Sequence, residues 1–115
     1  MTLQDGLIRL QPVIEKLEIE IDFVLFTRSG RRRAHWCGYG KRIEVAPLAE
    51  PYDVAHEIGH VVCGDSCCRE HAEFEAHGAA KMLCALLGLP LGDAEVRMDS
   101  YAGRSSHEAC GRITP

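Results

Sequence analysis

The five residues at positions 56 to 60 constrain this chain more than any other feature. They are His56-Glu57-Ile58-Gly59-His60, an H-E-x-x-H pattern. On an α-helix, residues four positions apart lie on one face, about 5–6 Å apart at Cβ, so the two imidazoles can bind one metal ion. Zn²⁺ fits this pair best, because it accepts neutral histidine nitrogen and keeps an open position in catalytic sites. The pattern therefore predicts a metal-binding helix.

Glu57 follows the first histidine, so it lies beside the ion rather than on it. A carboxylate in that place can take a proton from a water molecule that the ion has made more acidic. We therefore expect one Zn²⁺ per chain, with His56 and His60 as ligands and Glu57 as general base.

The residues around the motif favour a buried helix. Pro51 is typical of a first helical turn, and Gly64, followed by turn formers, is typical of a helix end. Apolar residues surround the motif at Val54, Ala55, Ile58, Val61 and Val62.

The preceding segment predicts one helix and a small sheet. Apolar residues at Leu3, Leu7, Leu10, Ile14 and Leu17 have helical spacing. Thr2 is a candidate cap, with Asp5 three residues on, and Pro12 is expected to bend or divide the helix. Alternating apolar residues predict a strand within 18–26, and turn signals at 29–30 and 38–40 leave room for strands near 33–37 and 42–46.

A second helix is expected after the metal helix, from about 69 to 88, ending before Pro90. Its alanine-rich stripe would let it approach a neighbouring helix closely. A further helical turn is expected at 93–98. The order predicts an α+β fold, with one domain over residues 1–98 and an irregular tail over 99–115.

A catalytic zinc normally has three protein ligands, and the third should come from this second helix. In a tight hairpin, position 74 is level with the midpoint of the two histidines, so Glu73 and Glu75 lie at the right height. They fall on opposite flanks of the alanine stripe, and periodicity does not choose between them.

The second motif carries a resemblance to a known family. Glu73-Phe74-Glu75-Ala76-His77-Gly78-Ala79-Ala80, followed by Leu83 and Pro90, is similar to the E-x-[EQ]-A-[ND]-x-F-A segment of ImmA/IrrE-like zinc metallopeptidases. With the sheet and H-E-x-x-H, the similarity covers roughly residues 18 to 90. It implies a minimal zincin-like fold of the gluzincin type, with Glu73 as the third ligand. The chain departs from the family at His77 and Ala79.

Other ligands stay open. SprT-like zincins follow H-E-x-x-H with a His-Gly whose histidine is the third ligand, and His77-Gly78 permits that alignment. Glu75, His71 and a cysteine are the remaining candidates.

The leading hypothesis is a zinc-dependent endopeptidase. Tyr101, Arg104 and His107 are candidates for stabilising the oxyanion. The substrate is expected to add a strand to an edge strand at 42–46. The resemblance implies a protein or peptide partner such as a regulatory protein or repressor.

Two other function classes compete with it. A zincin-fold protein without catalysis would bind zinc for structure, sensing or regulation, and Cys63 could then supply a fourth ligand. A nucleic-acid accessory protein would use the basic segment Arg31–Arg33, although a formal charge of -4 argues against nucleic-acid binding.

Composition sets the expected location. No apolar run of membrane-spanning length and no signal peptide is visible, so we expect a cytoplasmic protein that contacts no membrane. The six cysteines are then expected to be reduced. Cys63, Cys67 and Cys68 with His71 could form a second metal site, and a disulfide is the alternative for the cysteines. Cys84 is expected in the core.

Overall fold

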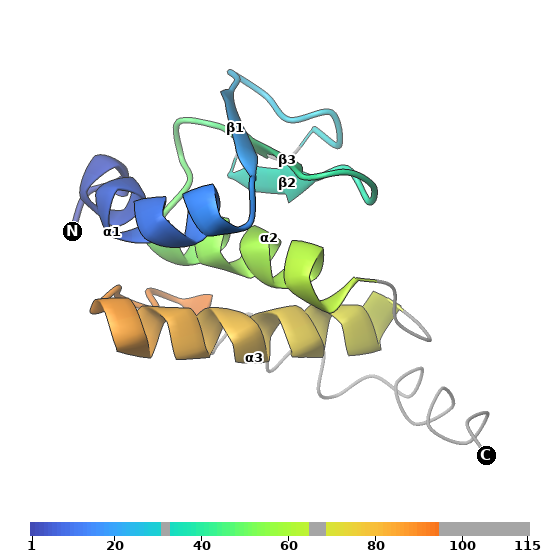
Figure 1. Ribbon diagram of the computed structural model, residues 1–115. Helices are drawn as coiled ribbons and strands as arrows, with labels where there is room; N and C mark the ends of the chain where they lie inside the picture. Colours follow the sequence, from blue (N-terminus) through green and yellow to red (C-terminus); the bar gives the residue numbers. More distant parts are fainter. Residues whose placement is uncertain (31–32, 65–68, 95–115) are drawn as a thin grey trace, which may run out of the picture.

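The computed structural model describes residues 1–30, 33–64 and 69–94. Within these ranges the elements are α1 (Leu3–Lys16), β1 (Glu20–Phe23), β2 (Ala34–Trp36), β3 (Arg42–Val45), α2 (Pro51–Cys63) and α3 (Arg69–Leu87) (Figure 1). The α+β class is confirmed, as are the predicted strands and helices. None of the described helices combines the length and the apolar character that crossing a membrane requires.

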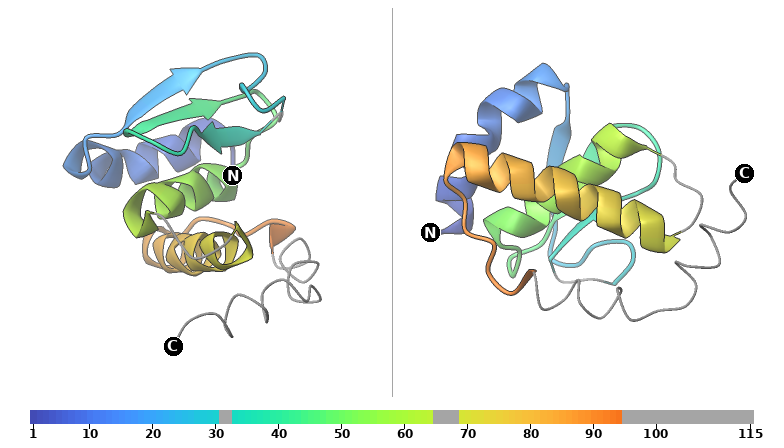
Figure 2. Two further views of the ribbon diagram at one scale, coloured as in Figure 1. Left: turned by 90° about the vertical axis from the view of Figure 1, so that its right-hand side faces the viewer. Right: turned by 90° about the horizontal axis from the view of Figure 1, so that it is seen from below.

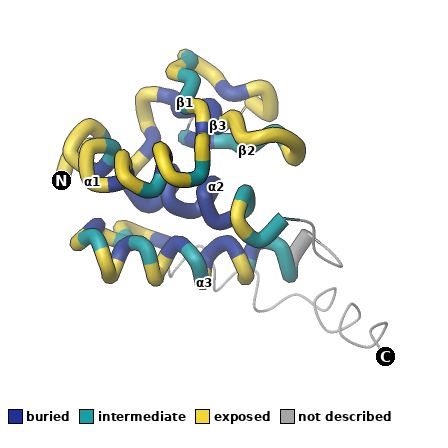
Figure 3. Tube along the Cα trace, in the orientation of Figure 1, coloured by how far each residue is buried: buried dark blue, intermediate teal, exposed yellow. Residues whose placement is uncertain are grey.

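The elements form three layers. The sheet lies on one side, α1 and α2 form the middle layer, and α3 covers the opposite face of α2 (Figures 1 and 2). Every residue of α2 from Pro51 to Gly59 is buried, which makes this helix the centre of the molecule (Figure 3). The H-E-x-x-H motif is therefore held from two sides, by the sheet and by α3.

The sheet has the strand order β1-β3-β2 in the described part of the chain. Strand β1 is parallel to β3 and β2 is antiparallel to it, so that Ile21 and Trp36 both pair with Ile43. The expectation that residues 42–46 form an edge strand is wrong, because β3 has a neighbour on both sides. Alternation of apolar residues predicts that a strand exists, but it carries no information about strand order.

Helix α1 begins where the sequence predicts. The Thr2 hydroxyl accepts a 3.1 Å hydrogen bond from the Asp5 N–H, which is the expected cap. Pro12 does not divide the helix, which is continuous from Leu3 to Lys16. Pro12 and Ile8, one turn earlier, are both exposed, so the carbonyl that loses its partner at the proline lies on the solvent side, where water can satisfy it.

Helix α2 also has the predicted ends. The Asp53 carboxylate accepts a 2.8 Å hydrogen bond from the N–H of Glu50, which closes the first turn around Pro51. Gly64 ends the helix with a φ of 68°, a conformation that glycine adopts at little cost.

Helices α2 and α3 approach closely at Gly59. A Cβ atom at this position would lie 2.5 Å from the carbonyl oxygen of Ala76. Ala76 is itself fully buried, so the expected role of the alanine stripe is confirmed. This close approach brings the side chains of α3 within reach of the two histidines.

Several expectations lie outside the described residues. These are the irregular tail at 99–115, the helical turn at 93–98 beyond Ala94, and the cysteine cluster at Cys67 and Cys68. Cys84 lies in the core with 2% of its surface exposed, as predicted. Cys37, Cys63 and Cys84 are free thiols.

Candidate metal centre

Two histidines of α2 converge on one carboxylate of α3. His56 Nε2 lies 2.8 Å from Glu73 Oε2, and His60 Nε2 lies 3.2 Å from Glu73 Oε1. Glu73 is buried, with 8% of its surface exposed. Each carboxylate oxygen thus has its own imidazole partner, and the three side chains form one polar cluster between the helices.

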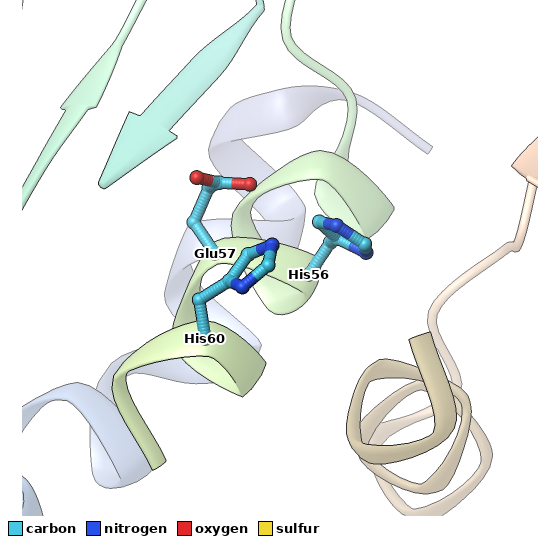
Figure 4. A group of neighbouring side chains, drawn as sticks. All are labelled: His56, Glu57 and His60. Carbon is cyan, nitrogen blue, oxygen red and sulfur yellow. The ribbon is translucent and has the colours of Figure 1, made fainter. Parts of the chain in front are cut away.

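His56, Glu57 and His60 form a group that could hold a metal ion. Their candidate ligand atoms all lie within 4.8 Å of one another. Figure 4 shows that Glu57 extends toward the sheet, whereas His56 points away from it, toward the side of α3. The carboxylate of Glu57 is therefore near the histidines but on a different flank of α2.

A hydrogen bond from the sheet holds Glu57. The backbone N–H of Trp36, the last residue of β2, donates to Glu57 Oε1 at 2.7 Å. Burial raises the pKa of the Glu57 carboxyl above its usual value, and the neighbouring histidines and the Trp36 N–H offset only part of this rise. A base whose pKa is shifted toward neutrality is better matched to proton transfer near neutral pH.

Glu73 has the opposite electrostatic character. Burial raises the pKa of its carboxyl, but hydrogen bonds from His56 and His60 and their positive charges outweigh burial, so the pKa falls well below its usual range. Glu73 is therefore the negatively charged member of the cluster, and Glu57 is the carboxylate whose proton affinity is raised.

The structure distinguishes the candidates for a third ligand by their positions. Glu75 is exposed on the outer side of α3. His77 is buried, but its Nδ1 lies 2.6 Å from the Tyr52 hydroxyl rather than in the cluster with Glu73. Among the described residues, the group of candidate ligand atoms is His56, Glu57 and His60. Glu73 lies outside that group, as Cys63 and His71 do, and its link to the site is its contact with both histidines.

Two aromatic residues that the sequence analysis did not single out contact the histidines. The Tyr52 hydroxyl lies 3.1 Å from His56 Nδ1. The Trp36 ring stacks on His60, with centroids 6.3 Å apart and planes 20° apart. Tyr52 precedes His56 by four residues, so helical spacing could have identified this contact. No comparable signal exists for Trp36, which comes from the sheet.

Three basic residues in and around the sheet pair with acidic groups of the same chain. Arg28 contacts Glu44 at 3.7 Å, Arg33 contacts Asp53 at 3.4 Å, and Arg42 contacts Asp22 at 2.6 Å. This pairing offsets much of the positive charge that a nucleic-acid surface would need.

Some predicted site residues lie outside the described part of the chain. These are Arg31 and Arg32 of the basic segment and the oxyanion candidates Tyr101, Arg104 and His107.

Comparisons with protein-family models, with curated proteins and with solved structures find no match for this chain. The resemblance to ImmA/IrrE-like peptidases therefore remains an expectation from the two motifs.

Proposed function

We propose that this protein is a zinc-dependent metallopeptidase that hydrolyses peptide bonds of a protein substrate. One observation carries the proposal. Two imidazole nitrogens of α2 and a charged carboxylate of α3 converge at 2.8 and 3.2 Å, while a second carboxylate, Glu57, is held beside them by the sheet. Three ligands plus a separate base is the arrangement of hydrolytic zinc sites.

The donor set fits Zn²⁺. Bonds of about 2.0–2.1 Å in a tetrahedral site place ligand atoms about 3.3 Å apart. The contacts of His56 and His60 with Glu73 are shorter, at 2.8 and 3.2 Å, and go to different oxygens of the carboxylate, so these side chains must move apart and reorient to bind one ion. Two neutral nitrogens and one carboxylate oxygen are also typical of catalytic zinc rather than of magnesium or calcium, which prefer oxygen ligands alone.

Glu57 acts as the general base and acid. Bound zinc would supply Lewis acidity, which polarises the scissile carbonyl and increases the acidity of the attacking water. Glu57 takes a proton from that water and passes it to the leaving amine. The Trp36 N–H fixes the carboxylate at Oε1 and leaves Oε2 available for this transfer.

The substrate is proposed to lie along β2, the edge strand next to Glu57. Ala46 N donates to the Arg33 carbonyl at 2.7 Å, and backbone groups in an antiparallel pair alternate in direction. Ala34 and Trp36 therefore turn their backbone groups away from β3. The Trp36 N–H is engaged by Glu57, so an extended peptide would pair with the Ala34 N–H and carbonyl and with the Trp36 carbonyl. N-methylation of the substrate amides that face these carbonyls should raise KM.

The resemblance to ImmA/IrrE-like enzymes supports a regulatory protein, such as a repressor, as the substrate. Free thiols at Cys37, Cys63 and Cys84 are compatible with the proposed cytoplasmic location.

The test compares Glu57→Gln with Glu75→Gln. Both changes remove one carboxylate from neighbouring helices, but only Glu57 is placed to move protons. Zinc-loaded proteins are incubated with a library of unfolded peptides, and new termini are counted by mass spectrometry. Glu57→Gln should keep zinc and lose cleavage, whereas Glu75→Gln should behave as wild type. Equal cleavage by wild type and Glu57→Gln would rule out the proposed mechanism.

A further inference from the structure

A buried hydroxyl connects one proposed ligand to a histidine outside the ligand set. The Tyr52 oxygen lies 3.1 Å from His56 Nδ1 and 2.6 Å from His77 Nδ1. Tyr52 is 3% exposed, and both histidines are 8% exposed. Buried polar groups need hydrogen-bond partners, and here the three side chains provide partners for one another.

The number of protons available determines which group donates in each of these two hydrogen bonds when a metal is bound. A phenol has one proton, so Tyr52 can donate to only one of the two rings and must accept from the other. His56 presents Nε2 to Glu73, and a histidine that binds a metal through Nε2 keeps its proton on Nδ1. The His56 Nδ1–H therefore donates to Tyr52, and the Tyr52 hydroxyl donates to His77 Nδ1.

We propose that Tyr52 is a positioning residue that holds His56 in its Nδ1–H form, and that His77 is the acceptor that fixes the Tyr52 hydroxyl. This inference rests on the proposed zinc centre. It assigns His77, four residues after Glu73, a role outside the ligand set. A neutral phenol then does the orienting that a carboxylate or carbonyl commonly does beside a zinc-bound histidine.

The two ligand histidines are held in different ways. His60 is held by stacking on Trp36, whereas His56 is held through Nδ1 by Tyr52. Removal of the Tyr52 hydroxyl therefore acts on His56 and leaves the contact of His60 with Trp36 in place. Trp36 is the sole tryptophan of the chain, so its fluorescence reports on His60.

The test measures Zn²⁺ affinity by chelator competition for wild type, Tyr52→Phe and His77→Leu. Tyr39→Phe is the matched control, because Tyr39 is 72% exposed. Loss of an orienting partner typically weakens metal binding by about 10–100-fold, and we expect this for Tyr52→Phe. His77→Leu should lose less zinc affinity than Tyr52→Phe, because the Tyr52 hydroxyl can still accept a hydrogen bond from His56. Tyr39→Phe should match wild type.

A second measurement needs no variant. Imidazole ¹⁵N spectra of zinc-loaded wild type should show His77 with a bare Nδ1 and a protonated Nε2. A His77 ring protonated at Nδ1 in that sample would overturn the proposal, as would wild-type zinc affinity in a folded Tyr52→Phe.

These outcomes separate the inference from the proposed function. Zinc binding without cleavage of any peptide would refute the peptidase, and the role of Tyr52 would still be judged from affinity and ¹⁵N spectra. A wild-type protein that binds no Zn²⁺ refutes both.

Discussion

The backbone N–H of Trp36 donates a 2.7 Å hydrogen bond to the carboxylate of Glu57. This contact joins the last residue of the edge strand β2 to the proposed base on α2. The same residue stacks on His60 through its ring. One residue of the sheet thus positions both the proposed base and one proposed ligand, so the site depends on the packing of the sheet against α2.

Trp36 provides a direct signal for metal binding. It is the only tryptophan of the chain, and its ring stacks on His60, so a charge bound at His60 should change its emission. We expect Zn²⁺ to change the fluorescence of metal-free protein with a one-to-one end point, and a chelator to reverse the change. Mg²⁺ should have no effect, because it prefers oxygen ligands. A spectrum that Zn²⁺ leaves unchanged would count against binding at His60.

Gly59→Ala should destabilise the protein. The added methyl group would lie 2.5 Å from the carbonyl oxygen and 3.0 Å from the Cα of Ala76, and these backbone atoms cannot move without separating α2 from α3. Overpacking of this kind costs about 1–3 kcal/mol, which exceeds the helix-propensity gain of about 1 kcal/mol. Zinc affinity should fall too, because His56 and Glu73 lie on opposite sides of this contact. Denaturant unfolding and chelator competition measure the two effects.

Gly78→Ala is the matched control for that change. A Cβ atom at Gly78 would meet nothing within 4 Å, so alanine there should stabilise α3 by about 0.5–1 kcal/mol. If Gly59→Ala and Gly78→Ala changed the free energy of unfolding equally, the close approach of α2 and α3 at Gly59 would be refuted.

The Cys84 thiol should resist alkylation in the folded protein. Burial raises its pKa above the ordinary value of 9.0, so the reactive thiolate is suppressed at pH 8, and only 2% of the residue is exposed. The raised pKa also means that the neutral thiol stabilises the fold below pH 9, and that this contribution is lost as the pH rises through the folded pKa. Mass spectrometry after brief iodoacetamide treatment should find Cys37 labelled well before Cys84. Equal labelling of both in native protein would contradict the burial of Cys84.

Most of the local structure could be predicted from the sequence. Periodicity, the Thr2 cap and the glycine after Cys63 predicted the helices closely, because these signals act between neighbours in the chain. Strand order was not predictable in this way, and β3 proved to be central rather than at the edge. The expectation that Pro12 would divide the first helix was also wrong, because Pro12 is exposed and water can satisfy the carbonyl that loses its hydrogen bond there.

The site was predictable only where its parts share a helix. His56, Glu57 and His60 follow from spacing alone, and Tyr52 could have been added by the same rule. The choice between Glu73 and Glu75 depends on how α3 is rotated against α2, which packing at Gly59 and Ala76 determines. The contact between Trp36 and Glu57 depends on sheet packing across 21 positions, which no local pattern encodes.

The most direct test of the account is the zinc affinity of wild type, Glu73→Gln and Glu75→Gln, measured by chelator competition on metal-free protein. An amide is a poor zinc ligand and lacks the negative charge of the carboxylate. Removal of a residue that only orients a ligand lowers metal affinity by up to roughly 100-fold, and Glu73→Gln should lower zinc affinity by more than this. Glu75→Gln should bind zinc as wild type does, with stability within about 0.5 kcal/mol of it. Retention of zinc by Glu73→Gln, with release by Glu75→Gln, would contradict the assignment of His56, His60 and Glu73 as the metal centre.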